Sequence, residues 1–193
     1  GLNAGDYSVQ VEYLGNENFL ESNAFANFTV GKHNSTTSVT IANVTYGENV
    51  TVYVNVTGID NEGLNGSVNV TINNETHLIT LVDGVGSLIV PGLNAGDYSV
   101  QVEYLGNENF LESNAFANFT VGKHNSTTSV TIANVTYGEN VTVYVNVTGI
   151  DNEGLNGSVN VTVNNETHVV TLVDGVGSLI VSGLNAGDYS VQV

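Results

Sequence analysis

The segment NVTVYVNVT at residues 49–57 gives the clearest indication of the fold, because a valine recurs at every second position. In an extended chain successive side chains point to opposite faces, so these valines would share one face. Thr, Asn and one tyrosine, Tyr53, occupy the other face. The stretch therefore predicts a β-strand with one buried and one solvent-facing side.

Further segments with the same alternation flank this strand on both sides, and turn-rich stretches with Gly, Asn and Asp separate them. No segment of useful length has the 3.6-residue period of a helix. Seven short strands in about 90 residues are typical of an immunoglobulin-like β-sandwich. We therefore expect an all-β chain of tandem immunoglobulin-like domains, each with about seven strands in a Greek key. The six other expected strands are 38–45, 67–73, 77–82, 86–90, 97–105 and 115–121.

The sequence repeats itself with a period of 91 residues, so that residues 1–102 align with residues 92–193. Near-identical copies suit a spacer or a multivalent array better than an enzyme. The stretch 30–38 has no large apolar residue after Val30, which predicts a linker. Only four aligned pairs differ, and three of them are apolar exchanges that a core tolerates: Ile72/Val163, Leu78/Val169, Ile79/Val170 and Pro91/Ser182.

This linker divides the chain into three expected parts. Residues 1–33 correspond to the last two strands, F and G, of a preceding repeat. Residues 34–124 form a complete domain, and residues 125–193 form the next repeat without its last strand. We expect the chain to be a window on a longer array.

The LNAGDY motif at residues 93–98 has the spacing of a tyrosine corner, in which a tyrosine hydroxyl at the start of strand F bonds to backbone a few residues upstream. The alternative is an ordinary core tyrosine, Tyr98, after a glycine turn.

Acidic residues outnumber basic ones 19 to 2, for a formal net charge of −17. Such a surface repels phosphates and anionic lipids, so we expect neither nucleic acid nor membrane partners. No apolar run approaches the ~20 residues of a membrane-spanning helix, so no membrane insertion is expected in this segment. With 41% hydrophobic residues the chain has enough apolar side chains for a packed core.

Three blocks in each copy carry a resemblance to a known family: GLNAGDYSVQVEYLGNENF (92–110), NFTVGKHNSTTSVTI (118–132) and TYGENVTVYVNVTG (45–58). They resemble the tandem immunoglobulin-like repeats of large adhesin-like surface proteins of methanogenic archaea. This resemblance implies an extracellular, cell-surface stalk or filament without an enzymatic role. It transfers no binding residue.

Each copy contains eight N-x-S/T sequons, the acceptor motif for N-glycosylation. Asn27, Asn55 and Asn69 fall out of phase with the apolar faces of their strands and are expected to face solvent. Asn43 shares the parity of the apolar residues before it, so it lies beyond a bulge or is a weaker acceptor. A composition rich in Asn and Thr also creates sequons by chance. The predicted acceptors are Asn27, Asn34, Asn49, Asn55, Asn65, Asn69, Asn74, Asn118, Asn125, Asn140, Asn146, Asn156, Asn160 and Asn165.

Four acidic residues occupy loops that gather at one end of an immunoglobulin fold: Asp60, Glu62, Asp83 and Glu108. Carboxylate oxygens are calcium ligands, so a Ca²⁺ site that stiffens the joint between domains is one interpretation. The other is a set of solvated loops with a surface ion pair from Lys32. Apart from Ca²⁺ and covalent N-glycans, no cofactor is expected.

The residues that catalysis would need are missing or badly placed. The chain has no cysteine, and His33 and His77 lack metal-ligand spacing and are expected on the surface. Lys32 lies in the polar linker and Gln101 faces outward, so neither favours a covalent cross-link. We therefore expect no enzyme.

The sequence leaves three hypotheses about function open. The chain is a structural repeat, a multivalent module for glycans or a host partner, or a subunit of a strand-exchanged fibre. Tyr46, Tyr53 and Phe110 are the aromatics expected to be exposed for stacking on a sugar. The expected partners are neighbouring repeats, other copies of the filament, and surface glycans.

Overall fold

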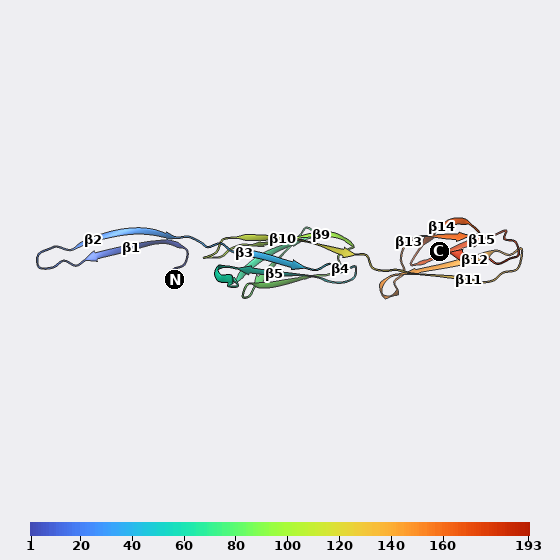
Figure 1. Cartoon of the computed structure of the whole chain (residues 1–193), viewed down its shortest axis with the longest axis horizontal. Helices are drawn as coiled ribbons and strands as arrows, with labels where there is room; N and C mark the ends of the chain where they lie inside the picture. The colour runs from blue at the N-terminus through green and yellow to red at the C-terminus, as the bar shows by residue number, and fades with distance from the viewer. The chain divides into compact units, whose positions relative to one another are not determined.

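The computed structural model describes all 193 residues, and its secondary structure consists mainly of β-strands. Its only helical segments are two 3₁₀ turns, η1 (Ile59–Asn61) and η2 (Ile150–Asn152). The chain divides into two compact units, Gly1–Gly122 and Lys123–Val193. The expected all-β class is confirmed (Figure 1).

The first unit contains a two-stranded hairpin followed by a sandwich. The hairpin consists of β1 (Gly5–Tyr13) and β2 (Ser22–Val30). The strands of the sandwich are β3 (Thr36–Ile41), β4 (Val44–Thr45), β5 (Val50–Thr57), β6 (Gly66–Ile72), β7 (Glu75–Leu81), β8 (Val85–Val90), β9 (Gly96–Tyr104) and β10 (Ser113–Gly122).

These eight strands form two sheets, with the orders β3-β5-β8 and β4-β10-β9-β6-β7. All neighbours are antiparallel except β10 and β4, which are parallel. The chain crosses between the sheets after β3, β4, β5, β7 and β8, and β9 comes to lie between β10 and β6. The result is a Greek-key immunoglobulin-like sandwich, as the strand spacing predicts.

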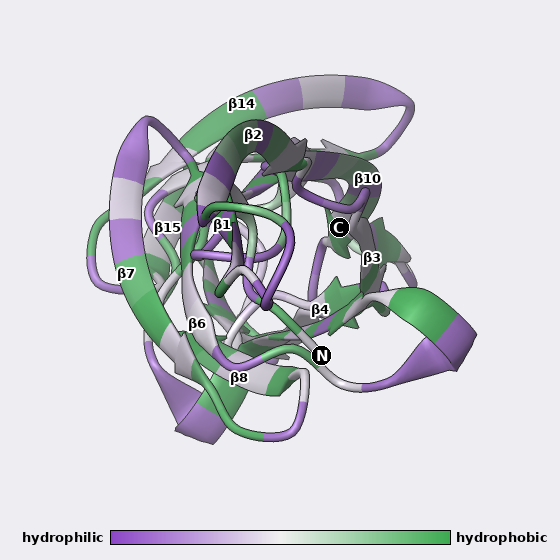
Figure 2. Cartoon of the chain, turned by 90° about the vertical axis from the view of Figure 1, so that its left-hand side faces the viewer, coloured by the Kyte–Doolittle hydropathy of each residue, from purple (hydrophilic) through white to green (hydrophobic).

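The core lies between the two sheets and follows the period-2 pattern. In β5 the side chains of Val50, Val52, Val54 and Val56 are at most 1% exposed, whereas Tyr53 between them is 57% exposed. Hydrophilic and hydrophobic residues are interleaved along the strands in Figure 2. The buried residues from the facing sheet are Val68, Val70, Ile72, Leu81, Val100, Val102, Tyr104, Phe119 and Val121.

The expected single strand at 38–45 is wrong, because the structure divides it into β3 and β4. The chain leaves one sheet after Ile41 and joins the other at Val44, where β10 supplies a parallel partner. Between them the Asn43 Oδ1 accepts a hydrogen bond from the Thr120 N–H at 2.8 Å. The break accounts for the parity of Asn43, which is exposed although it shares the phase of Ile41.

Tight two-residue turns flank β7 on both sides. Asn73 and Asn74 connect Ile72 to its partner Glu75 and have φ of 50° and 64°. Asp83 and Gly84 connect β7 to β8 with φ of 49° and 80°. Positive φ at both central residues is the geometry of the type I′ turn, which Asn, Asp and Gly tolerate best.

The tyrosine corner is confirmed. The Tyr98 hydroxyl donates to the Asn94 carbonyl at 2.9 Å, four residues upstream. The same bond recurs from Tyr7 to Asn3 at 2.8 Å and from Tyr189 to Asn185 at 3.1 Å.

The second unit repeats most of this arrangement. One sheet has the order β11-β12-β15 and the other has the order β14-β13-β16. Its core residues include Val143, Val145, Val161 and Leu172. The bounds are β11 (Thr127–Ile132), β12 (Val141–Thr148), β13 (Gly157–Val163), β14 (Glu166–Leu172), β15 (Val176–Val181) and β16 (Val191–Gln192).

Strand β7 offers a test of the buried face with its own control. Leu81 is 2% exposed and Leu78 is 68% exposed. We expect Leu81→Ala to lower the free energy of unfolding of the first unit by about 2–5 kcal/mol, because it leaves a cavity between the sheets. Leu78→Ala should change it by less than about 0.5 kcal/mol. Urea unfolding followed by circular dichroism measures both, and equal effects would contradict the assignment of the two faces.

Candidate functional site

Three loops of the sandwich meet at one end of the first unit, as the sequence predicts for this fold. They are residues 58–65, 82–84 and 105–112. The Asn65 Oδ1 accepts a hydrogen bond from the Asp83 N–H at 2.8 Å. The first two loops approach so closely that a Cβ on Gly63 would lie 2.0 Å from the Asp83 carbonyl oxygen. A side chain at this position would push the loops apart.

Phe110 closes this loop cluster from the third loop. Its ring lies against Gly58, where an added Cβ would come within 2.4 Å of the Phe110 Cε1, and Leu64 lies beside the same glycine. Phe110 is only 8% exposed, so the expectation that it is an exposed aromatic is wrong. Its counterpart Phe19, in the same sequence context, is 69% exposed. No local sequence signal distinguishes the two, because the difference comes from the loops packed on Phe110.

The incoming segment before β3 is bound to the same loop cluster. The His33 N–H donates to the Asn109 carbonyl at 2.8 Å, and the Leu111 N–H donates to the His33 carbonyl at 2.8 Å. The Lys32 ammonium donates to the Asn107 carbonyl at 2.7 Å. The sequence indicated a polar linker here but gave no signal for these contacts. The polar stretch is therefore docked along the loop.

The acidic residues of these loops do not converge. Nowhere in the chain do three or more His, Asp or Glu side chains form a group that could hold a metal ion. Asp60, Glu62, Asp83 and Glu108 are all exposed. Calcium binding therefore stays a prediction from the sequence, without a converging ligand set to support it.

The two histidines of the first copy differ in their surroundings. His33 is exposed, as expected, and its ring lies 6.4 Å from that of Phe110. His77 is only half-exposed because it points along the inner side of β7. Its Nε2 is buried without a hydrogen-bond partner, 3.8 Å from a Glu75 carboxylate oxygen.

Tyr104 is the buried phenol nearest the loop cluster. Burial raises the pKa of the Tyr104 hydroxyl, because desolvation disfavours the phenolate. The hydroxyl donates to the Asn65 carbonyl at 3.3 Å. This bond ties the end of β9 to the first loop, which is a structural role.

The predicted glycosylation acceptors lie on exposed surface, with one exception. Asn69 is half-buried, because its register places it between Leu78 and Glu103 on the outer face of the sheet. The exposed acceptors are Asn27, Asn34, Asn49, Asn55, Asn65, Asn74, Asn118, Asn125, Asn140, Asn146, Asn156, Asn160 and Asn165.

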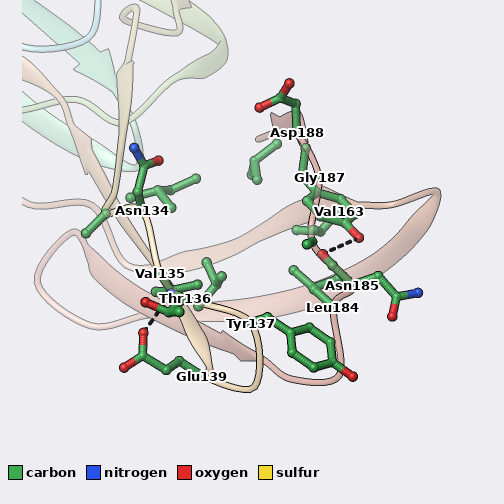
Figure 3. A pocket seen from close by; sticks show the side chains of 16 residues that line it. Asn134, Val135, Thr136, Tyr137, Glu139, Val163, Leu184, Asn185, Gly187 and Asp188 are labelled. Carbon is green, nitrogen blue, oxygen red and sulfur yellow. Dashed lines mark hydrogen bonds between the residues drawn. The ribbon is translucent and has the colours of Figure 1, made fainter.

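A hollow of about 520 Å³ opens in the second unit, lined by residues 132–137 and 184–189 among others (Figure 3). In the first unit the corresponding residues contact β10. Val44 pairs with Val121, and the Tyr98 ring stacks on Phe119 with ring centroids 5.3 Å apart. The hollow therefore corresponds to the place that β10 fills in the first unit.

Two of the three expected exposed aromatics are on the surface. Tyr53 is 57% exposed on the outer face of β5, and its counterpart Tyr144 is 55% exposed on β12. Tyr46 is 39% exposed. These rings are accessible but do not line a common cleft with converging polar groups.

The fold and this loop cluster define the class: the chain contains immunoglobulin-like β-sandwich domains. Residues 35–122 match the sequence model of the family described as "Bacterial Ig-like domain (group 3)". Families of immunoglobulin-like domains such as this one are typically non-catalytic. No curated protein matches the chain in sequence.

Several solved structures are similar at low identity, each with a TM-score of 0.35. Fibronectin(III)-like modules of CbhA from Clostridium thermocellum are 13% identical over 80% of this chain and 83% of that one. The Escherichia coli adhesin FdeC is 18% identical over 86% of this chain and 62% of that one. An Escherichia coli alpha-2-macroglobulin activated by porcine elastase is 12% identical over 97% of this chain and 22% of that one.

None of the helical segments is long and apolar enough to cross a lipid bilayer.

The two copies of the loop phenylalanine provide a matched test. We expect Phe110→Ala to destabilise the first unit by about 3–5 kcal/mol, because it removes the ring packed between two loops. Phe19→Ala, at the exposed counterpart, should cost less than about 0.5 kcal/mol. Thermal and urea unfolding measure both. The assignment of Phe110 as the closing side chain fails if the two variants are equally stable.

Proposed function

We propose that this chain is a structural segment of an extracellular, N-glycosylated stalk or filament in an adhesin-like surface protein. The observation that supports this most strongly is the repetition. Hairpin β1–β2 has the same register as β9–β10, shifted by 91 residues, from Gly5 opposite Val30 to Tyr13 opposite Ser22. In this proposal one repeat is one structural unit, and each added unit lengthens the array by a fixed increment.

In this proposal residues 1–33 are strands F and G of a preceding repeat and residues 34–124 are one complete domain. Residues 125–193 begin the next repeat. The large buried core of residues 36–122 supports independent folding of each repeat. A segment whose repeats fold separately suits a role outside the cell as a spacer.

The chemistry of the described surfaces fits this non-catalytic role. The pKa of Tyr104 is shifted by burial alone, and this phenol lies in the core. Strong pKa shifts in a cleft are typical of catalytic groups. The acidic surface, with a formal net charge of −17, disfavours nucleic acid and anionic membranes as partners.

Glycosylation is supported by the position of the acceptors on outer faces. Asn55 lies between Ser38 and Val85 on the outer face of one sheet, and Asn118 is exposed on β10 of the other. Sugars there would shield the sheets and hinder pairing between near-identical repeats.

The test is the intact mass of the protein purified from its native organism. We expect a mass above that of the bare polypeptide, with the excess on peptides that contain Asn55 or Asn118. Peptides around the half-buried Asn69 should carry less sugar. A mass equal to that of the polypeptide would refute glycosylation.

A second candidate function is multivalent binding of surface glycans or a host partner, supported by the exposed rings of Tyr53 and Tyr144. One such ring on each copy would provide avidity. A glycan array probed with the whole chain tests this idea. Binding that is lost on the double substitution Tyr53→Ala and Tyr144→Ala would favour it over a spacer role, and no binding would exclude it for the glycans on the array.

Strand exchange between copies in a fibre is the remaining alternative. It is weakened by the pairing of β9 and β10 with β4 and β6, because all four strands lie within residues 34–124. Images of the native filament in which strand G can be traced would decide between exchange and pairing within a copy.

A further inference from the structure

The loop between β9 and β10 makes polar contacts with two parts of the chain that precede the sandwich. The Asn109 Oδ1 accepts a hydrogen bond from the Ala4 N–H at 2.8 Å, and its Nδ2 donates to the Asn3 Oδ1 at 3.2 Å. The Asn109 carbonyl accepts the His33 N–H at 2.8 Å. One residue thus bonds both the turn before β1 and the segment after β2.

The loop that carries Asn109 is preformed by its own sequence. The Asn107 Oδ1 accepts the N–H groups of Asn109 and Phe110, each at 2.9 Å. In the hairpin the Asn16 Oδ1 accepts the equivalent bonds from Asn18 and Phe19, at 2.9 and 3.0 Å. Because both copies of the loop adopt this turn, the contacts of Asn109 are not what shapes it.

The turn that Asn109 binds is also preformed. The Tyr7 hydroxyl donates to the Asn3 carbonyl at 2.8 Å, which is the tyrosine corner of the hairpin. This bond holds the Ala4 N–H and the Asn3 side chain at the surface. Two ordered elements therefore meet, so little conformational entropy is lost when they bind.

The segment after β2 adds a second line of contact. His33 and Phe110 form a parallel bridge, and the Lys32 ammonium donates to the Asn107 carbonyl at 2.7 Å. Further along, the Ser35 hydroxyl donates to the Leu111 carbonyl at 2.7 Å. Contacts on both sides of Asn109 resist bending in more than one direction.

We propose that Asn109 is the positioning residue of a repeating joint, in which the loop between β9 and β10 binds the tyrosine-corner turn of the preceding repeat and fixes its orientation. The turn and the linker recur 91 residues later, at residues 94–95 and 123–124. The partner of this surface is thus the preceding repeat of the same chain. The inference rests on the proposal that residues 1–33 belong to such a repeat.

The absence of cysteine allows spin labels to be placed freely in the whole chain. Labels on Ser8→Cys and Ser87→Cys report the hairpin against the sandwich, and labels on Ser8→Cys and Glu21→Cys report the hairpin alone. Distances are measured by pulsed electron paramagnetic resonance. We expect a narrow distribution for both pairs in the otherwise unaltered chain. In Asn109→Ala we expect the first pair to broaden while the second stays narrow.

The matched control is Asn18→Ala, at the exposed counterpart of Asn109 in the hairpin loop. It should leave both distributions unchanged. Amide exchange gives a second readout: the Ala4 N–H loses its hydrogen bond to the Asn109 Oδ1 in Asn109→Ala, so it should exchange on the order of tenfold faster.

Three outcomes would overturn the proposal. The first is a broad first-pair distribution in the unaltered chain, and the second is no change in Asn109→Ala. The third is equal broadening of both pairs, because Asn109 would then support the hairpin fold and not its orientation. None of these results bears on the mass of the protein from its native organism. A mass equal to that of the bare polypeptide would refute glycosylation but would not contradict the proposed joint. The two proposals therefore fail separately.

Discussion

The contact between apolar rows of the two sheets is the interaction on which the other features depend. The valines of β5 are at most 1% exposed and share a core with residues of β6 and β9 such as Val70 and Val102, which are fully buried. Burial of apolar surface contributes roughly 25 cal/mol per Å² and has no preferred direction. The same alternation sends Asn55 and Tyr53 outward. The outer faces are thus free to carry sugars without disturbing the core.

Because apolar burial has no preferred direction, polar turns and side-chain hydrogen bonds must set the register of the strands. The Asn73–Asn74 turn and the Asp83–Gly84 turn each reverse the chain in two residues. The Tyr98 hydroxyl fixes the crossing into β9. These turns and hydrogen bonds also shape the ends of the sandwich. The tyrosine corner, for example, presents the turn that the proposed joint would bind. Fold and function are linked through them.

Near-identical neighbouring domains carry a risk of pairing with one another. The charge of −17 and the exposed sequons both act against such pairing, the first by repulsion and the second by bulk when they carry sugars. A joint held by Asn109 would add to this by keeping each repeat in one orientation. The proposed stalk therefore depends on a dry interior, a polar exterior and an ordered connection.

Comparison of the repeated segments shows which features follow from local sequence and which require contacts between distant segments. Identical local sequence forms the same tyrosine corner at Tyr7, Tyr98 and Tyr189 and the same turn at Asn16 and Asn107. Such bonds span at most four residues, so they need no distant partner. The strand positions other than 38–45, and the buried faces within the sandwich, followed from the same short-range period. The hairpin strand β1 has the same alternation as β9 but no buried residue.

Identical segments also differ in structure or exposure where the residues that pack against them differ. Val44 and Thr45 form β4 beside β10, whereas residues 135 and 136 of the second unit form no strand. Phe110 is 8% exposed and Phe19 is 69% exposed. The docking of His33 was likewise invisible in the sequence. For the break at Asn43 and the dispersal of the acidic side chains, the sequence offered alternatives without deciding between them. Each of these features depends on contacts between segments far apart in the chain. Such contacts form only when the two sheets pack together, so local sequence does not reveal them.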